Sequence, residues 1–113
     1  MKEETMIVDG KEYVIRIGRN DKENWNLIDD SNQYDMWFHL DDNPSPHVVL
    51  ACKNDVTGIY PKQLIFKCAC LCKNYSKFSN VKKIKVIYTH IKNITKSDTI
   101  GSVYTKKLEK ITV

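Results

Sequence analysis

The 113-residue sequence contains no long apolar run, no Gly-rich phosphate loop and no internal repeat. A membrane helix needs about 18 to 20 consecutive apolar residues, so the sequence excludes one. The start of the chain also lacks the basic and apolar regions of a secretory signal. No linker or low-complexity segment divides the sequence, and a chain of this size builds one core. We therefore expect a single domain over residues 1–113 that lies in the cytoplasm and binds no membrane.

Catalytic patterns are equally scarce. There is no Ser-His-Asp order and no pair of glutamates at a spacing suited to acid–base work, so we expect neither catalytic residues nor a cofactor. One exception is the pair His39 and His47, which could bind a metal with Asp41 or Asp42 or titrate near neutral pH. The alternative is structural: each ring would hydrogen-bond to the backbone of the proline-containing turn between the two histidines and brace it.

Cysteine occurs four times, and three of the four lie in the segment KCACLCK. In a helix Cys68 and Cys72 share a face while Cys70 points elsewhere, so one metal ion cannot reach all three. A site made of Cys52, Cys68 and Cys72 is geometrically conceivable, but a buried free cysteine acting as a small apolar residue is commoner. We expect no metal site and, without export, no disulfide.

The spacing of apolar residues predicts an α+β fold, with antiparallel strands and hairpins packed around one main helix. A hairpin that turns at Asp9 and Gly10 is expected within residues 6–17. The other expected strands are residues 36–40, 47–52, 84–89, 102–105 and 111–113. Residues 61–77 predict the main helix, and residues 18–34 a polar loop with one short helix around 23–28.

The predicted main helix has two stripes. Its expected buried face consists of Leu64, Cys68, Leu71, Cys72 and Tyr75, and its expected outer face of Lys62, Phe66, Ala69, Lys73 and Lys77. Pro61 is expected in the first turn, where its missing N–H costs nothing.

Positive charge is concentrated in the second part of the chain. Residues 1–60 have six Lys and Arg against twelve Asp and Glu, and residues 61–113 have twelve against two, which gives net charges of −6 and +10. Such a positive region attracts phosphates. Alternatively, the two parts neutralise each other in the fold, because neighbours in sequence need not cluster in space.

Aromatic side chains accompany the basic residues. Such rings stack on the bases of single-stranded RNA beside cations that hold phosphates. Burial competes for each ring, so we expect Trp37 and Phe38 in the core and only one or two of the others free. The other candidates are Trp25, Tyr34, Phe78, Tyr88 and Tyr104.

Several short motifs occur in a characteristic order from about residue 13 to residue 113. They are Gly18-Arg19-Asn20 with Asn24, Asp35-Met36-Trp37-Phe38-His39, Pro44-Ser45 with His47-Val48-Val49, Tyr75-Ser76-Lys77, Val86-Ile87-Tyr88-Thr89, Lys92 and Gly101-Ser102-Val103. Together they resemble the NFACT-R RNA-binding domain, which ends the ribosome quality-control factors RqcH and NEMF and also occurs as small stand-alone proteins. The chain resembles the stand-alone type.

The resemblance implies a non-catalytic module that binds RNA, with tRNA or rRNA as partner and the large ribosomal subunit as a platform. It marks the loop at 18–24, the corner at 35–47 and the segment at 75–77 as the binding surface. The residues expected to bind nucleic acid are Arg19, Asn20, Lys22, Asn24, Asp35, Trp37, His39, Ser45, His47, Tyr75, Ser76 and Lys77.

Two other functions compete with RNA binding. A DNA-binding or protein-docking adaptor would use the same basic surface, and a metal-dependent enzyme would use His39 and His47. The RNA hypothesis depends on one expectation: the lysines after residue 60 fold back beside Arg19 and form a single cationic platform.

Overall fold

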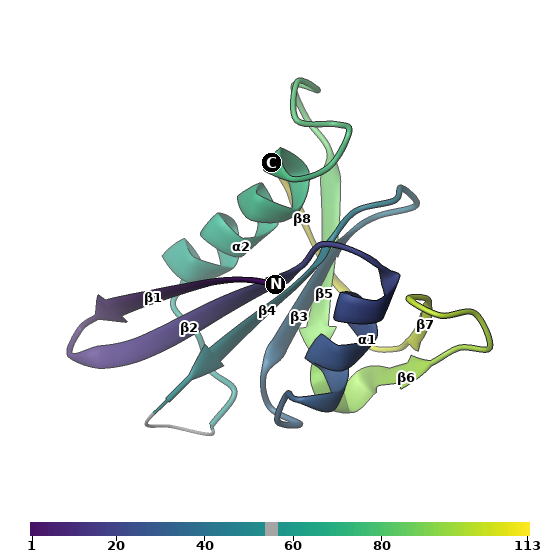
Figure 1. The fold of residues 1–113 in the computed structure, drawn as a ribbon. Helices are drawn as coiled ribbons and strands as arrows, with labels where there is room; N and C mark the ends of the chain where they lie inside the picture. The colour runs from purple at the N-terminus through teal and green to yellow at the C-terminus, as the bar shows by residue number, and fades with distance from the viewer. Residues whose placement is uncertain (54–56) are drawn as a thin grey trace.

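The computed structural model describes residues 1–53 and 57–113 (Figure 1). In chain order the elements are β1 (Lys2–Val8), β2 (Lys11–Gly18), α1 (Asp21–Asp29), β3 (Met36–Leu40), β4 (His47–Cys52), α2 (Lys62–Asn74), β5 (Lys85–His90), the 3₁₀ helix η1 (Ile91–Asn93), β6 (Ile94–Lys96), β7 (Val103–Thr105) and β8 (Glu109–Thr112). Six strands form one sheet in the order β1-β2-β4-β3-β5-β8, and β6 pairs with β7 separately. All pairings are antiparallel, which confirms the α+β class.

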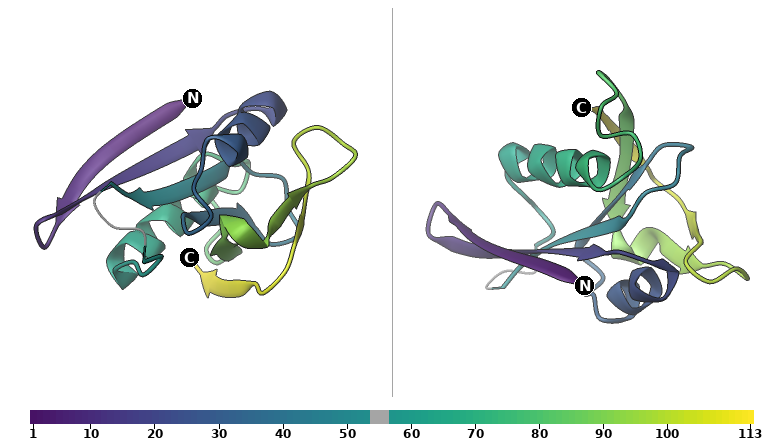
Figure 2. Two further views of the ribbon diagram at one scale, coloured as in Figure 1. Left: turned by 90° about the horizontal axis from the view of Figure 1, so that it is seen from below. Right: turned by 45° about the horizontal axis from the view of Figure 1, so that its top comes forward.

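The two helices cover opposite faces of the six-stranded sheet (Figure 2). Successive side chains of a strand point to opposite faces, so each strand feeds two cores. From β3, Phe38 packs in the larger core with α2, whereas Trp37 packs in the smaller core with Leu27 of α1. Trp37 and Phe38 are both buried, as expected.

The first hairpin forms as predicted, with β1 and β2 paired from Lys2 opposite Ile17 to Val8 opposite Lys11. Its two turn residues, Asp9 and Gly10, have φ values of 50° and 80°. A two-residue turn with positive φ at both positions matches the twist of the strands, and Gly tolerates that conformation without steric cost.

The main helix α2 is shorter than expected, and its buried face is rotated. Pro61 precedes the helix and its carbonyl accepts hydrogen bonds from the backbone N–H groups of Leu64 and Ile65. Ala69, expected on the outer face, is buried, whereas Tyr75, expected on the buried face, follows the last helical residue and is 45% exposed. Four-residue steps advance about 40° around a helix, so the buried stripe drifts toward Ala69. Tyr75 lies beyond the last helical residue, Asn74, where the helical period no longer applies.

The short helix expected within the loop at 18–34 is present as the nine-residue α1. Asn20 caps it: the side-chain Oδ1 accepts from the Glu23 backbone N–H at 2.9 Å. The Glu23 carboxylate reaches back and accepts from the Arg19 backbone N–H at 3.0 Å. This hydrogen bond, together with the N-terminal ammonium and the Arg19 side chain, lowers the pKa of Glu23 to about 2. In the described part of the chain, no helix is long and apolar enough to cross a membrane.

Candidate nucleic-acid interface

Two neighbouring cavities lie where the turn between β3 and β4 meets the start of α1. The smaller, of about 300 Å³, is bounded by three segments far apart in sequence: Arg19 and Asn20 before α1, residues 44–46 of the turn, and residues 75–77 after α2. These are parts of the three regions that the resemblance marked as a binding surface. The fold therefore brings Arg19 and Lys77 to one cavity although 58 positions separate them in the sequence.

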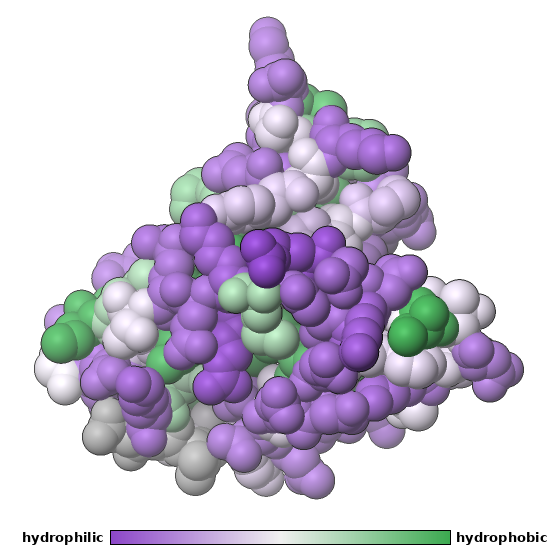
Figure 3. Space-filling model, in the orientation of Figure 1, coloured by the Kyte–Doolittle hydropathy of each residue, from purple (hydrophilic) through white to green (hydrophobic). Residues whose placement is uncertain are grey.

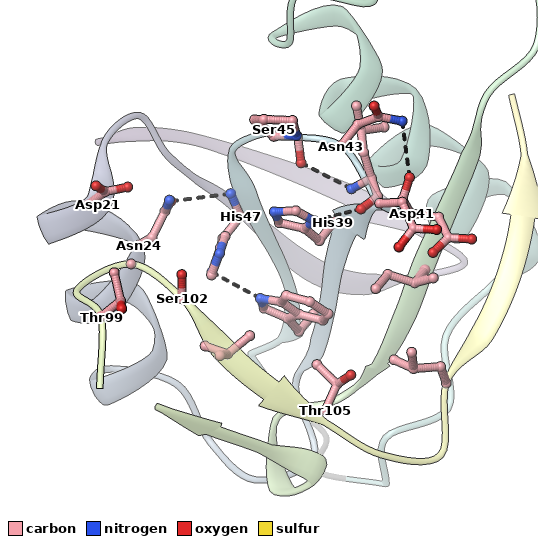
Figure 4. Close-up of a pocket in the computed structure, with 18 of the residues that line it drawn as sticks. Asp21, Asn24, His39, Asp41, Asn43, Ser45, His47, Thr99, Ser102 and Thr105 are labelled. Carbon is pink, nitrogen blue, oxygen red and sulfur yellow. Dashed lines mark hydrogen bonds between the residues drawn. The ribbon is translucent and has the colours of Figure 1, made fainter. Parts of the chain in front are cut away.

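The larger cavity has a volume of about 640 Å³, and Figure 4 shows residues that line it. Trp37, His39 and His47 line it from the sheet, and residues 99–103 line it from the loop that leads into β7. Both cavities are lined by the same four residues at their common border: Asp21, Asn24, Pro44 and Ser45. The two hollows are therefore parts of one continuous surface.

Asn24 joins α1 to the sheet at this border. Its side-chain Oδ1 accepts a hydrogen bond from the His47 backbone N–H at 3.2 Å, and Asn24 is buried. The close approach requires Gly18, because a Cβ added there would lie 2.3 Å from Asn24 Oδ1. The motif residues Gly18, Asn24 and His47 thus share a structural role in placing α1 beside the turn.

The two histidines form a compact ring cluster with Trp37. The Trp37 indole Nε1–H donates to His47 Nδ1 at 3.1 Å, and the rings of Trp37 and His39 stack at 5.6 Å. His39 Nδ1 lies 2.6 Å from its neighbouring carbonyl at Leu40. If the histidines only brace the turn, both rings should hydrogen-bond to the backbone there. The His39 ring does bond to a backbone group, the Leu40 carbonyl. His47 Nδ1 instead accepts from the Trp37 side chain.

Burial keeps both imidazoles neutral at physiological pH. Burial, with a smaller contribution from the neighbouring His39, lowers the pKa of His47 to about 3. Burial likewise lowers the pKa of His39. Because a neutral imidazole whose Nδ1–H donates has an acceptor at Nε2, the His39 ring offers the cavity an acceptor.

The segment after α2 is held by local hydrogen bonds. Ser76 Oγ donates to the Lys73 carbonyl at 2.7 Å and accepts from the Phe78 backbone N–H at 3.1 Å, so Ser76 shapes the turn. The Tyr75 hydroxyl accepts a hydrogen bond from Lys2 of β1. Lys77 is exposed and forms no salt bridge with another described residue, so its charge faces solvent at the smaller cavity.

Two of the residues expected to bind nucleic acid line neither cavity. Lys22 lies on the exposed surface of α1. Asp35 is buried at the opposite end of β3 from His39, and its carboxylate accepts from the Asn32 backbone N–H at 2.9 Å. Burial raises the pKa of Asp35 against the effect of that hydrogen bond. Asp35 therefore stabilises the turn before β3 and does not line either cavity.

Part of the positive charge expected to form a single platform is neutralised within the fold, which corrects the expectation on which the RNA hypothesis was based. RNA binding must then depend on a smaller cationic site. Three of the lysines after residue 60 pair with carboxylates from the first sixty residues: Lys67 with Glu4 at 3.7 Å, Lys96 with Asp29 at 2.6 Å and Lys110 with Asp41 at 3.1 Å. Of the lysines expected to surround Arg19, only Lys77 lines the smaller cavity with it. The segment that follows α2 projects from the molecule in Figure 1 and is hydrophilic in Figure 3.

The aromatic rings expected to stack on bases lie apart from one another. Lys96 Nζ lies 5.2 Å from the ring centre of Trp25, and Lys92 Nζ lies 5.1 Å from that of Tyr34. Tyr88 stacks on Phe38 at 5.5 Å, whereas Tyr104 is 62% exposed. Cation–π contacts and packing thus occupy several of these rings.

The sequence analysis missed the loop before β7 as a wall of the site. Trp25 Nε1–H donates to the Ser102 carbonyl at 3.1 Å, and Gly101 has a φ of 86° with Asp21 packed against it. A Cβ at Gly101 would lie 2.6 Å from the Asp21 carboxylate, so Gly is required there. The signal was the motif Gly101-Ser102-Val103, which belonged to the resemblance but carried no assigned role.

Among the described residues, no three His, Cys, Asp or Glu side chains are placed to hold a metal ion. The four cysteines are free thiols, with Cys68 and Cys72 buried and Cys52 and Cys70 partly exposed. The two histidines do meet, at 5.2 Å between ring centres, but His39 Nδ1 and His47 Nδ1 are both engaged in hydrogen bonds.

Comparison with known proteins identifies the class to which this fold and site belong. The family model described as the NFACT protein RNA binding domain matches residues 5–106. The chain therefore belongs to this family of RNA-binding domains, as the motifs indicated.

Coiled-coil domain-containing protein 25 is a relative found in several vertebrates. The chain is 33% identical over 92 residues to the proteins of Bos taurus and Mus musculus, and 32% identical over 95 residues to that of Danio rerio. These alignments cover 80–82% of this chain and 44–46% of the relatives. The chain thus spans less than half the length of the curated relatives it matches.

A solved structure shares the fold. It is the C-terminal part of the fibronectin/fibrinogen-binding protein from Streptococcus suis, with a TM-score of 0.82 and 23% sequence identity. The match covers 96% of this chain and 44% of that one.

Proposed function

We propose that residues 1–113 act as one domain that binds structured RNA, namely tRNA or rRNA, without catalysing a reaction. The observation that carries this proposal is the smaller cavity, where Arg19, Asn20 and Lys77 converge beside Ser45 and Ser76. A guanidinium, an ammonium and short polar groups around one hollow suit the phosphates and 2′-hydroxyls of RNA. Membership of a family of RNA-binding domains supports the same function.

The charge of Arg19 is only partly offset within the protein. Its Nε lies 3.4 Å from Glu23 Oε1, and its side chain is 62% exposed. Since an exposed pair of this kind contributes about 0–1 kcal/mol, a phosphate can compete for the guanidinium. With Lys77, this gives two cations that can replace counterions on an RNA backbone.

We further propose that the domain works in the cytoplasm and that the large ribosomal subunit is one platform on which it meets RNA. The support for this step is the resemblance to the ribosome quality-control factors. Crosslinking in cells, followed by sequencing of the attached RNA, tests it. Recovery of tRNA or rRNA is expected, and an Arg19→Glu/Lys77→Glu variant should lose it.

A salt titration tests the proposed surface in solution. The affinity for a tRNA should fall steeply between 50 and 300 mM KCl, with a log–log slope that decreases by about 0.7–0.9 for each phosphate contact removed. Arg19→Glu/Lys77→Glu should therefore bind more weakly and with a shallower slope. Lys62→Glu/Lys92→Glu is the matched control, because it makes the same change of charge at residues that line neither cavity.

Equal losses in the two double variants would show that the surface is misplaced, and affinity that stays flat with salt would contradict RNA binding through phosphates. Competition with DNA of matched sequence separates the RNA function from a DNA-binding adaptor, because only RNA carries the 2′-hydroxyl. Equal competition by DNA would favour the adaptor.

A further inference from the structure

The larger cavity differs in charge from the smaller one beside it. No Lys or Arg is among the described residues that line it, and its charged lining residues are Asp21, Asp41 and Asp42. Asp41 is paired with Lys110 at 3.1 Å and Asp21 lines both cavities, so the difference in charge comes from Asp42 on one side and from Arg19 and Lys77 on the other. Arg19 and Lys77 line the smaller cavity instead. An RNA phosphate is therefore attracted to the smaller cavity and repelled from the larger one.

The walls of the larger cavity suit a flat, uncharged group. Ile100 and Leu108, which are 50% and 37% exposed, supply apolar surface to the cavity, and the partly exposed His39 ring, stacked on the buried Trp37, also lines it. The cavity of about 640 Å³ is large enough for a single heterocyclic base. Unpaired bases that leave an RNA loop are typically held against apolar and aromatic side chains.

The polar lining of the larger cavity includes three groups that can accept a hydrogen bond from a ligand. His39 uses Nδ1–H toward the Leu40 carbonyl, so Nε2 is an acceptor. Asn43 uses its amide N–H toward the Asp41 carbonyl at 3.1 Å, which leaves its side-chain oxygen as an acceptor. Asp42 adds a carboxylate on an exposed turn position. These three acceptors lie beside groups that can donate, namely the Asn24 side-chain amide and the hydroxyls of Thr99 and Ser102. A base with an exocyclic amino group can use the acceptors as its partners.

The common border sets the arrangement of a ligand that occupies both cavities. Asn24 and Ser45 line each of them, and Asn24 is fixed by its bond to His47. A phosphate beside Arg19 and Lys77 would place its own sugar near Ser45 and its base in the larger cavity. The opposite arrangement would bring the phosphate against carboxylates.

We propose that the two cavities form one site for an unpaired RNA nucleotide, with the phosphate at Arg19 and Lys77 and an amino-bearing base, cytosine, adenine or guanine, in the larger cavity. The inference rests on the proposed RNA-binding function and adds a base preference to it. Carboxylates accept from the exocyclic amino group of cytosine, and amide and imidazole acceptors do the same for adenine. Uracil offers carbonyl oxygens at the corresponding positions and is disfavoured.

Short oligoribonucleotides test the base preference by fluorescence anisotropy at fixed salt. The probes are eight-residue oligomers of C, A and U and an abasic backbone of the same length. The C and A oligomers should bind at least about fivefold more tightly than the U oligomer, as one good base contact allows. The abasic backbone should bind most weakly, yet still respond to salt.

Single substitutions test whether the base preference arises in the larger cavity. Asp42→Asn removes an acceptor and should reduce the preference for C over U severalfold, and asparagine tolerates the φ of 58° at this position. Asp30→Asn is the matched control, because it removes one carboxylate from a residue that lines neither cavity. Arg19→Glu/Lys77→Glu should weaken all oligomers equally and leave the ratio unchanged.

The outcomes separate this inference from the proposed function. If all oligomers, including the abasic one, bind equally and with steep salt dependence, RNA binding stands and the base site is wrong. If C is preferred and Asp42→Asn keeps the full ratio, as Asp30→Asn does, the larger cavity is not where the base lies. If no RNA binds at any salt concentration, both proposals fail and a protein partner is the better explanation of the surface.

Discussion

At the scale of single residues, two of the motif positions support one another through contact. Gly18 leaves room for Asn24, and Asn24 in turn holds the His47 backbone. A side chain at Gly18 should displace Asn24 and so weaken the hydrogen bond between Asn24 and His47, because a well-packed interior does not relax freely.

Gly18→Ala should lower the free energy of unfolding by about 1–3 kcal/mol, measured by urea denaturation. The added Cβ would lie 2.3 Å from Asn24 Oδ1 and 3.1 Å from the Asn24 backbone. Asn24→Ala removes the oxygen that clashes, so the double variant should be less destabilised than the sum of the two single changes by about 0.5–3 kcal/mol. Strict additivity would contradict the proposed contact.

His47 should make the fold sensitive to mild acid. Its pKa is about 3 in the folded protein and 6.5 when unperturbed, so the unfolded chain binds more protons between these values. Stability is therefore full above pH 6.5 and decreases as the pH falls toward 3, by about 2 kcal/mol between pH 6.5 and 5. His39 acts in the same direction, because burial lowers its pKa as well.

The measurement is the free energy of unfolding at pH 7, 6 and 5. His47→Gln removes the titrating group while a side-chain oxygen can still accept from the Trp37 indole, so the loss on acidification should shrink. Glu23 does not interfere, since its pKa falls from 4.5 to about 2 and it acts below this window. An unchanged pH dependence in His47→Gln, and equally in His39→Gln, would contradict the assignment.

At the scale of elements, the reactivity of the three cysteines in α2 reports which face of the helix is buried. Burial raises the pKa of Cys68, Cys70 and Cys72, but Cys68 and Cys72 lie in the core beneath the helix, whereas Cys70 is partly exposed and accessible to a reagent. The thiolate is the reactive form, so buried thiols with a raised pKa react slowly.

In the native protein, a thiol reagent should modify two cysteines quickly, Cys52 and Cys70, and the other two at the rate of unfolding. The number and rate of modified thiols can be followed by mass spectrometry. Cys70→Ala should remove one fast event, and urea should make all remaining thiols reactive together. Four equal rates in native buffer would mean that α2 does not pack as described.

The sequence predicted most strands and both helices, because the order of apolar and polar residues within each segment determines its secondary structure. The strands at 36–40 and 47–52 match β3 and β4, since alternating apolar residues flank a proline-containing turn. β6 was missed because Ile94–Lys96 is too short to show a period, and its partner lies beyond a loop. The face of α2 was partly wrong because the helix ends at Asn74, before Tyr75.

The candidate site was predicted less completely because it depends on distant contacts. The resemblance marked Arg19, Ser45 and Lys77, and the structure brings these to one cavity. It also marked Asp35, which the structure shows buried in the turn before β3. In one sequence, a carboxylate that holds a turn looks the same as one that binds a ligand. The wall formed by residues 99–103 was missed although the motif Gly101-Ser102-Val103 was noticed, because its place in the site depends on a hydrogen bond between α1 and a loop more than seventy positions away.

At the scale of the whole molecule, the net charge of +4 hides an uneven field. Pairs such as Lys67 with Glu4 and Lys96 with Asp29 neutralise lysines across the fold, and exposed pairs of this type add little stability. Other cations, such as Lys77, have no carboxylate partner among the described residues, so positive charge remains only at certain places on the surface. Local arrangement and not total charge thus determines where a polyanion is attracted.

The outermost strands of the six-stranded sheet, β1 and β8, each have one neighbour. The exposed ends of these strands carry Lys2, Glu3 and Glu4 on β1 and Glu109 and Lys110 on β8. Charged side chains of both signs along a free margin hinder one copy from extending its ladder onto another, which is a common defence against fibre growth. The same architecture that holds the cavities therefore also helps copies of the protein to stay apart at high concentration.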